Sequence, residues 1–236
     1  MAEQANLAQQ AGLPAALASE VPLDWVEVTV AGRTWRILAV LNQDRLLDLA
    51  DRLAHVPYGF LLWESAVALA QLLATLPGGL AGKRVLELGA GLGLTGLVAR
   101  SLGADVWQTD HEPHLLTLAA YNAAVNQIGG IHQFVADWRS WQHTGQYDLL
   151  LGADILYERV MHPYLEPIFS RNLAHGGRLI LADPSRPQAL TFMAELETRG
   201  WQFDLTVERI DLPVLQRSPK PVEVALWTGR PAARRL

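Results

Sequence analysis

The chain of 236 residues contains no cysteine. This absence excludes a disulfide framework, thiolate metal sites and a thiol nucleophile. The seven histidines show no spacing that is typical of metal ligands, and we therefore predict no metal site.

Basic residues are too few to form a nucleic-acid surface. The formal net charge is −5, and the one basic cluster, Arg230, Arg234 and Arg235, lies at the C-terminal end of the sequence. Nucleic-acid binding generally needs a basic face, so we expect no nucleic-acid partner. Residues 231–236 are expected to be a solvated basic tail.

Long uninterrupted apolar runs are also missing. The longest, residues 59–76, carries Glu64 and Gln71 and is shorter than the roughly 20 apolar residues of a membrane-spanning helix. The N-terminus has neither the basic and apolar regions of a secretory signal nor the arginines of a transit peptide. We therefore expect a cytoplasmic protein without a membrane partner.

Apolar residues are abundant, because 50% of the sequence is hydrophobic and only 18% is charged. This composition supports a large core, and the length favours one domain with an extension. We expect the extension over residues 1–57, with a loose leader, a β-hairpin formed by 24–30 and 34–40, and a short helix over 45–53.

Strands and helices alternate through residues 58–230, which predicts a doubly wound α/β sheet with right-handed crossovers. The expected strands are 84–88, 104–109, 131–136, 147–152, 178–182, 201–210 and 222–227. The expected helices are 63–73, 94–102, 112–127, 161–173, closed by Gly176-Gly177, and 188–199. No helix separates the last two strands, so we expect them to form an antiparallel hairpin at one edge of the sheet.

The stretch 85–96 joins the first of these strands to a helix through a glycine-rich loop. Glycines at alternate positions let the backbone turn sharply and let a ligand lie against it. The free N–H groups at the start of the following helix add donors and a partial positive charge. This pattern is typical of a nucleotide-binding loop.

Two cofactors compete for this loop. The spacing Gly91-x-Gly93-x-x-Gly96 satisfies the dinucleotide fingerprint, and Asp110 follows where a ribose-binding acid is expected. The same loop also follows an acidic residue, Glu87, that lies inside the strand. That arrangement resembles motif I of the class I S-adenosylmethionine-dependent methyltransferases.

Glu87 favours the second interpretation. A buried acid in a parallel strand is unfavourable without partners, so its presence needs a reason. In a methyltransferase it would tie down the glycine loop and face the methionine end of the cofactor. A dinucleotide site offers no such reason.

Acidic residues recur at the carboxyl ends of the expected strands, where ligands bind in open α/β sheets. They are Glu87, Asp110, Asp137, Asp154 and Asp183. Any one of them could cap a helix, but five at strand ends are harder to explain by capping. An acidic rim suits a cationic sulfonium better than it suits a pyrophosphate.

Several motifs together resemble the seven-β-strand lysine methyltransferase group often called methyltransferase family 16. They are motif I at 87–93, Asp110, the pair Asp137-Trp138, the stretch Asp154-Ile155-Leu156-Tyr157, and Trp63 before motif I. The stretch Asp183-Pro184-Ser185-Arg186 is similar to one in the electron-transfer-flavoprotein lysine methyltransferase branch. The resemblance covers about 58–227, and Asp-Trp with Asp-x-x-Tyr is its most specific part.

The resemblance implies a Rossmann-like seven-stranded sheet of order 3-2-1-4-5-7-6 with strand 7 antiparallel. It also implies S-adenosylmethionine as the cofactor, with Asp110 at the ribose hydroxyls and Asp137 and Trp138 at the adenine. The implied cofactor-binding residues are Trp63, Glu87, Gly89, Ala90, Gly91, Gly93, Asp110, His111, Asp137, Trp138 and Ala153.

Asp154 and Tyr157 are the implied catalytic residues, and they would face the acceptor. A lysine acceptor must lose a proton before it attacks, which costs roughly 4 kcal/mol at pH 7. An aromatic wall adds about 0.5–2 kcal/mol of cation–π attraction. Because a carboxylate also favours the charged amine, we expect Asp154 to position the amine and not to act as a strong base.

The leading hypothesis is therefore an S-adenosylmethionine-dependent N-methyltransferase acting on a lysine side chain of a protein. A small-molecule N-methyltransferase is the first alternative. A cofactor-binding module without turnover and a nicotinamide oxidoreductase are the others.

Overall fold

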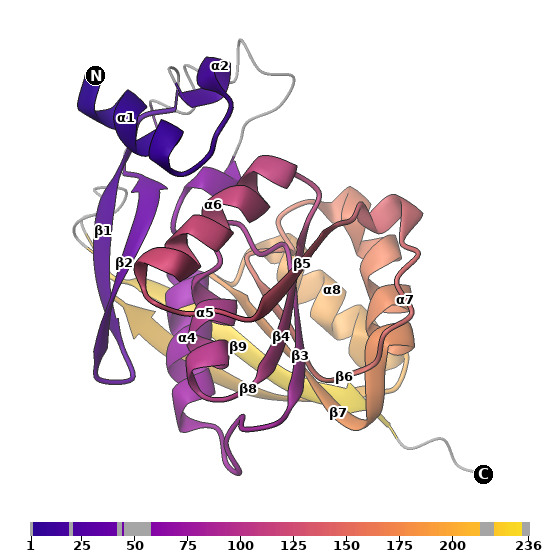
Figure 1. Ribbon diagram of the computed structural model, residues 1–236. Coiled ribbons are helices and arrows are strands. Elements are labelled where there is room, and N and C mark those ends of the chain that lie inside the picture. Colours follow the sequence, from indigo (N-terminus) through magenta and orange to yellow (C-terminus); the bar gives the residue numbers. More distant parts are fainter. Residues whose placement is uncertain (1, 19–20, 42–43, 45–57, 213–219, 233–236) are drawn as a thin grey trace.

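The computed structural model describes residues 2–18, 21–41, 44, 58–212 and 220–232. Its main feature is a seven-stranded sheet (Figure 1). The strands are β3 (Arg84–Leu88), β4 (Asp105–Asp110), β5 (Ile131–Val135), β6 (Tyr147–Ala153), β7 (Leu173–Asp183), β8 (Trp201–Ile210) and β9 (Val222–Pro231). Their order is β5-β4-β3-β6-β7-β9-β8, with β9 antiparallel to both of its neighbours. The expected order and the reversed last strand are confirmed.

Helices cover both faces of the sheet (Figure 1). On one face lie α4 (Glu64–Thr75), α5 (Leu94–Ser101) and α6 (Pro113–Val125), and on the other α7 (His162–Asn172) and α8 (Pro187–Thr198). Successive strand residues alternate between two cores: Val85 packs with the first group and Leu86 with the second. Within the described ranges, none of the helices has the length and apolar character needed to cross a membrane.

Strand β7 is longer than the expected range 178–182, because it already begins at Leu173. Its pairing with β6 is shifted before Arg178, and Gly176 in this irregular part has φ 77°. Such a backbone conformation favours glycine and is common in bulges. The expectation that Gly176-Gly177 closes the preceding helix is therefore wrong, since α7 ends at Asn172.

The N-terminal extension contains a separate two-stranded sheet. Its strands β1 (Leu23–Val30) and β2 (Arg33–Val40) are antiparallel, and Ala31 and Gly32 between them both have positive φ. This is the backbone of a tight hairpin turn and confirms the hairpin. The leader forms helices α1 (Ala2–Gln10) and α2 (Ala15–Ala18), and the helix expected over 45–53 lies outside the described residues.

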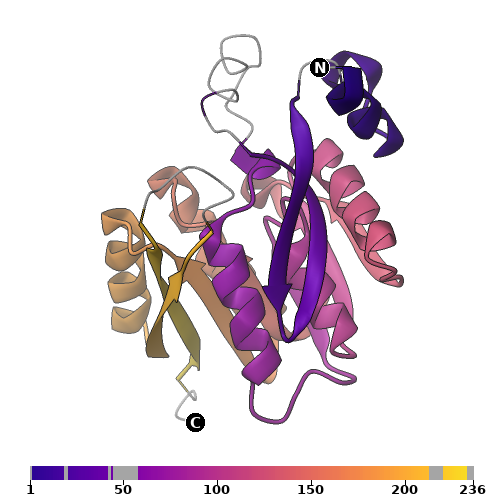
Figure 2. The same cartoon turned by 90° about the vertical axis from the view of Figure 1, so that its left-hand side faces the viewer.

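The hairpin stands beside α4 and α6, apart from the main sheet (Figure 2). Two asparagines of α6 bind its strand β2. Asn126 accepts a hydrogen bond from Arg36 N (3.0 Å) and donates to Arg36 O (2.7 Å). Asn122 accepts from Leu38 N (2.8 Å) and donates to Leu92 O (3.1 Å) in the glycine loop. The side chains of α6 therefore take the place of a neighbouring strand and connect the hairpin to that loop.

Replacing Asn122 by alanine should lower the free energy of unfolding by roughly 2–4 kcal/mol. Asn122 is fully buried, and its removal leaves the Leu38 N–H and the Leu92 carbonyl without a partner. Urea denaturation measures the change. Thr117→Ala is the matched control on α6, because the residue is exposed and its hydroxyl donates to Pro113 O of the same helix; it should change stability by less than about 0.5 kcal/mol. Equal effects of the two substitutions would argue against the asparagine contacts.

Candidate functional site

A cavity of about 1140 Å³ opens beyond the carboxyl ends of the parallel strands. This is the place where ligands bind in open α/β sheets. Every site residue expected from the sequence lines it: Trp63, Glu87, Gly89, Ala90, Gly91, Gly93, Asp110, His111, Asp137, Trp138, Ala153, Asp154 and Tyr157. Residues between positions 63 and 157 are thus brought to a single site.

The glycine loop between β3 and α5 has no room for side chains at two positions. Gly89 has φ 62°, and a Cβ there would lie 2.9 Å from Ile155 Cγ2. Gly93 has φ 83° and begins α5, and a Cβ there would lie 2.8 Å from Ala119 Cβ. Both positions therefore require glycine for conformation and for space.

Glu87 is buried below this loop. Its Oε2 accepts hydrogen bonds from Gly96 N (3.0 Å) and from Gln108 Nε2 (2.8 Å), and Gln108 also donates to Gly93 O (3.1 Å). Glu87 thus links β3 to β4 and to the start of α5. Burial raises the pKa of Glu87 to about 7, although these hydrogen bonds act in the opposite direction. Gln108 was not identified from the sequence, because a glutamine in a strand carries no motif of its own.

The raised pKa of Glu87 predicts a specific pH dependence of stability. The folded state holds a proton up to about pH 7, and the unfolded state loses it near 4.5. The stabilisation is therefore complete below pH 4.5 and is lost as pH rises through 7. The loss of this stabilisation between pH 5 and pH 8 amounts to roughly 2.5 kcal/mol.

Glu87→Gln should remove this contribution while keeping an acceptor oxygen for both donors. The free energy of unfolding of the variant minus that of the parent should therefore increase by roughly 2.5 kcal/mol as pH rises from 5 to 8. Urea denaturation at each pH measures both values. Glu197→Gln, an exposed change on α8, is the control and should follow the parent. A constant difference between Glu87→Gln and the parent at all pH values would contradict the assignment.

Asp110 lies at the tip of β4, with its carboxylate held by the backbone. Oδ2 accepts from Gly91 N (3.0 Å), and Oδ1 accepts from Glu112 N (3.1 Å). His111 Nδ1 is 3.2 Å from Asp110 Oδ1 and its Nε2 is 3.7 Å from Glu112 Oε1. The hydrogen bond to Asp110 raises the pKa of His111, against an opposing effect of burial.

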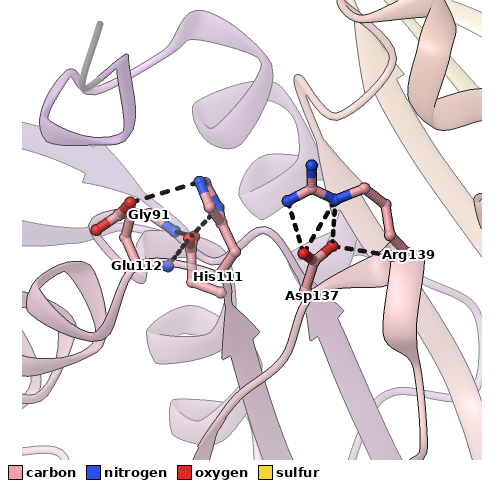
Figure 3. Close-up of polar contacts among 6 residues, drawn as sticks. Gly91, His111, Glu112, Asp137 and Arg139 are labelled. Atoms are coloured by element: carbon pink, nitrogen blue, oxygen red, sulfur yellow. Dashed lines mark hydrogen bonds and ion pairs between the residues drawn. The ribbon is translucent and has the colours of Figure 1, made fainter. Parts of the chain in front are cut away.

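Asp137 and Arg139 form a separate ion pair on the neighbouring loop (Figure 3). The Arg139 guanidinium donates to both carboxylate oxygens at 2.7–3.0 Å and lowers the pKa of Asp137. Trp138 between them lies against the glycine loop, since a Cβ on Gly89 would be 3.5 Å from its Cζ2. Arg139 was not identified from the sequence, which indicated only Asp137 and Trp138 at this position.

Asp154 follows β6 in a left-handed backbone conformation with φ 57° and is only 8% exposed. Its Oδ1 accepts a hydrogen bond from Arg186 Nη1, which also donates to Asp183 Oδ2 (2.7 Å). Burial raises the pKa of Asp154, and the positive charge of Arg186 opposes this effect. Asp183 is completely buried and does not line the cavity, so four of the five acidic residues face the ligand space.

Three aromatic rings form the wall next to Asp154. Tyr58 is central, with its ring centroid 6.4 Å from that of Tyr157 and 6.2 Å from that of Trp63. Burial raises the pKa of Tyr157 to about 12, so its hydroxyl is neutral at physiological pH and does not serve as a base. Tyr58 was not identified from the sequence.

The N-terminal leader also contributes to the site. Pro14 and Leu17 line the cavity together with the loops of the main sheet, and Leu13 and Ala18 beside them are buried in the core. The extension is therefore part of the cavity wall, which neither composition nor periodicity of the leader indicated.

Relatives of known activity match much of this chain. It is 43% identical over 127 residues to Protein N-lysine methyltransferase METTL21A of Danio rerio, which covers 51% of this chain and 57% of that protein. It is 30% identical over 182 residues to the electron transfer flavoprotein beta subunit lysine methyltransferase of Mus musculus, which covers 74% of this chain and 68% of that protein. The chain thus spans little more than half the length of the first relative and about two thirds of the second.

The fold is also that of a solved methyltransferase. The N-methyltransferase NodS from Bradyrhizobium japonicum, in complex with S-adenosyl-L-homocysteine, superimposes with a TM-score of 0.56 at 17% identity, covering 72% of this chain and 87% of NodS. The model of the family described as lysine methyltransferase matches residues 41–199. Because that match covers more than half of the chain, the protein belongs to the lysine methyltransferase family.

Proposed function

We propose that this protein transfers a methyl group from S-adenosylmethionine to the side-chain nitrogen of a lysine in a protein substrate. The observation that supports this most is the single cavity that combines the glycine loop with Asp154, Tyr157 and their aromatic neighbours. Both relatives described above are named lysine methyltransferases. We assign residues 58–230 to the methyltransferase domain, 1–57 to an extension that helps to build the site, and 231–236 to a tail. The cytoplasmic location stays a prediction.

The cavity suits this cofactor in size and charge. Its volume of about 1140 Å³ exceeds the roughly 300–1,000 Å³ typical of small-ligand pockets, so a cofactor and an acceptor side chain fit together. Glu87, Asp110, Asp137 and Asp154 all line it, and carboxylates favour a cationic ligand. When bound, S-adenosylmethionine supplies an electrophilic methyl group on a positively charged sulfur.

We assign the cofactor contacts as follows. Asp110 accepts hydrogen bonds from the two ribose hydroxyls, because its carboxylate is already oriented by the backbone of the loops around it. The Trp138 indole lies against the adenine, and Gly89, which also lines the cavity, faces the methionine part. Since Asp137 is paired with Arg139, we assign it mainly to holding Trp138 in position by capping the short helix η2 (Trp138–Ser140).

The other end of the cavity receives the lysine. Asp154 orients the amine, and Tyr58 and Tyr157 form walls against its alkyl chain. The amine would lose a proton to solvent and use its lone pair to take the methyl group that S-adenosylmethionine would supply, with the electron pair of the C–S bond kept by sulfur. Most of the rate enhancement comes from alignment of the reacting atoms, an effect worth up to about 7–11 kcal/mol.

Labelled cofactor tests the proposed acceptor directly. Incubation of the protein with methyl-tritiated S-adenosylmethionine and a cell lysate should label a protein band, and acid hydrolysis of that band should release methyl-lysine. Label in small molecules alone would support the small-molecule alternative, and methyl-arginine would replace lysine as the acceptor. Binding of NAD in place of S-adenosylmethionine, measured by calorimetry, would exclude the proposal.

Asp154→Asn separates an enzyme from a binding module without turnover. Loss of the carboxylate should lower the rate of methyl transfer by roughly 10²-fold, since misplacement of a reacting group by about 1 Å has an effect of this size. Calorimetric titration should show little change in affinity for S-adenosylhomocysteine. The matched control is Asp148→Asn on the same strand, because Asp148 binds Arg84 N at the far end of β6. An unchanged rate in Asp154→Asn would favour the binding module.

A further inference from the structure

Arg186 is held in a fixed position at the acceptor end of the cavity. Its Nη1 binds both Asp154 and Asp183, and its own backbone N donates to Asp183 Oδ1 (2.8 Å). The residue precedes α8, and its side chain is only 25% exposed. Three contacts to two buried carboxylates leave the guanidinium little freedom to move away.

The cation lies next to the space that a lysine must enter. Arg186 lines the cavity with Asp154 and Tyr157, and its Cζ is 6.0 Å from the ring centroid of Trp63. Because Asp154 Oδ1 binds Arg186, the carboxylate meets an incoming amine as one half of an ion pair. This ion pair therefore attracts the charged form of the amine less strongly than a free carboxylate would.

Other charged and titratable groups near this end are few in the described part of the chain. Asp183 of β7 binds Arg186, and the Ser65 hydroxyl of α4 lies near Asp154. The negative charges of Asp110 on β4 and of Glu158 after β6 raise the pKa of Tyr157. Apart from Arg186, the charges of this group are negative. Arg139 also lines the cavity, but it is paired with Asp137. The positive charge that contacts the Asp154 carboxylate, and that opposes an ammonium there, is that of Arg186.

On the basis of the proposed function, we propose that Arg186 is a positioning residue for methyl transfer. It fixes the Asp154 carboxylate and, as a permanent positive charge beside the acceptor nitrogen, favours the neutral amine that can attack. The step itself is unchanged: the amine releases its proton to solvent and then forms the N–C bond. The stretch Asp183-Pro184-Ser185-Arg186 thereby gains a function within the reaction.

The proposal predicts a shift in the pH dependence of the rate. A nearby positive charge lowers the pKa of an amine, so its removal should raise that pKa. Arg186→Gln should move the midpoint of the acidic limb of the pH–rate profile upward by about one pH unit or more, which is a loss of about tenfold in rate at pH 7 that is recovered at high pH. Arg186→Lys keeps the charge and should restore the parent midpoint.

The measurement uses the full chain and the proteins of a cell lysate as acceptor, with initial rates of tritium incorporation into methyl-lysine between pH 6 and pH 10. Arg199→Gln is the matched control, because Arg199 pairs with Glu166 and Glu195 outside the cavity. Its profile should equal that of the parent. If Arg186→Gln does not fold, the double variant Asp183→Asn/Arg186→Gln removes one of the two carboxylates left unpaired. Its midpoint should still shift upward, but by less than that of the single variant, because Asp183 does not line the cavity and its lost negative charge offsets only part of the effect.

A folded Arg186→Gln or double variant with an unchanged midpoint would overturn the proposal, even if its rate were uniformly lower. Equal midpoints for Arg186→Lys and Arg186→Gln would also overturn it, since charge would then be irrelevant. Failure of the parent protein to transfer label at any pH would instead contradict the proposed function. The two failures are therefore distinguishable.

Discussion

The buried carboxylate of Glu87 is the contact on which the site depends most. Parallel strands bring backbone ends to one edge of a sheet, but they do not by themselves hold a glycine loop there. Glu87 does so by binding Gly96 N on α5 and Gln108 on β4 at the same time. A charged group in a sheet covered on both faces is unfavourable, which is why its pKa rises to about 7. The unfavourable burial of Glu87 is thus linked to a glycine loop that is held in one position.

The charge of the cavity is less negative than its carboxylates alone would make it. Two of the four acids that line it are paired with arginines, Asp137 with Arg139 and Asp154 with Arg186. A third, Glu87, holds a proton up to about pH 7. Asp110 thus carries the carboxylate best placed to bind a ligand directly, with the imidazole of His111 beside it. The cavity attracts a cation moderately and leaves room for a neutral amine.

The N-terminal extension is joined to the catalytic part through hydrogen bonds as well as through the shared core. Asn122 binds both the hairpin at Leu38 and the glycine loop at Leu92, so a single side chain of α6 contacts both units. The leader residues Pro14 and Leu17 complete the wall of the cavity. The leader therefore forms part of the cavity wall, and the hairpin is connected through Asn122 to the glycine loop that forms another part.

The sequence by itself determined the strands and the hairpin, because periodicity and turn residues are local patterns, and it placed the glycine loop and the strand-end acids at one edge of the sheet. The strand order and the other residues around the cavity followed from the resemblance to methyltransferase family 16. It could not determine the partners of those acids. Arg186 is 32 positions from Asp154 and Gln108 is 21 from Glu87, and only the packing of neighbouring strands brings them together. The start of β7 at Leu173 was missed for the same reason, since a bulge depends on pairing with β6. Local patterns indicate which residues line the cavity. Tertiary contacts determine which partners those residues have, and therefore how much charge they present to a ligand.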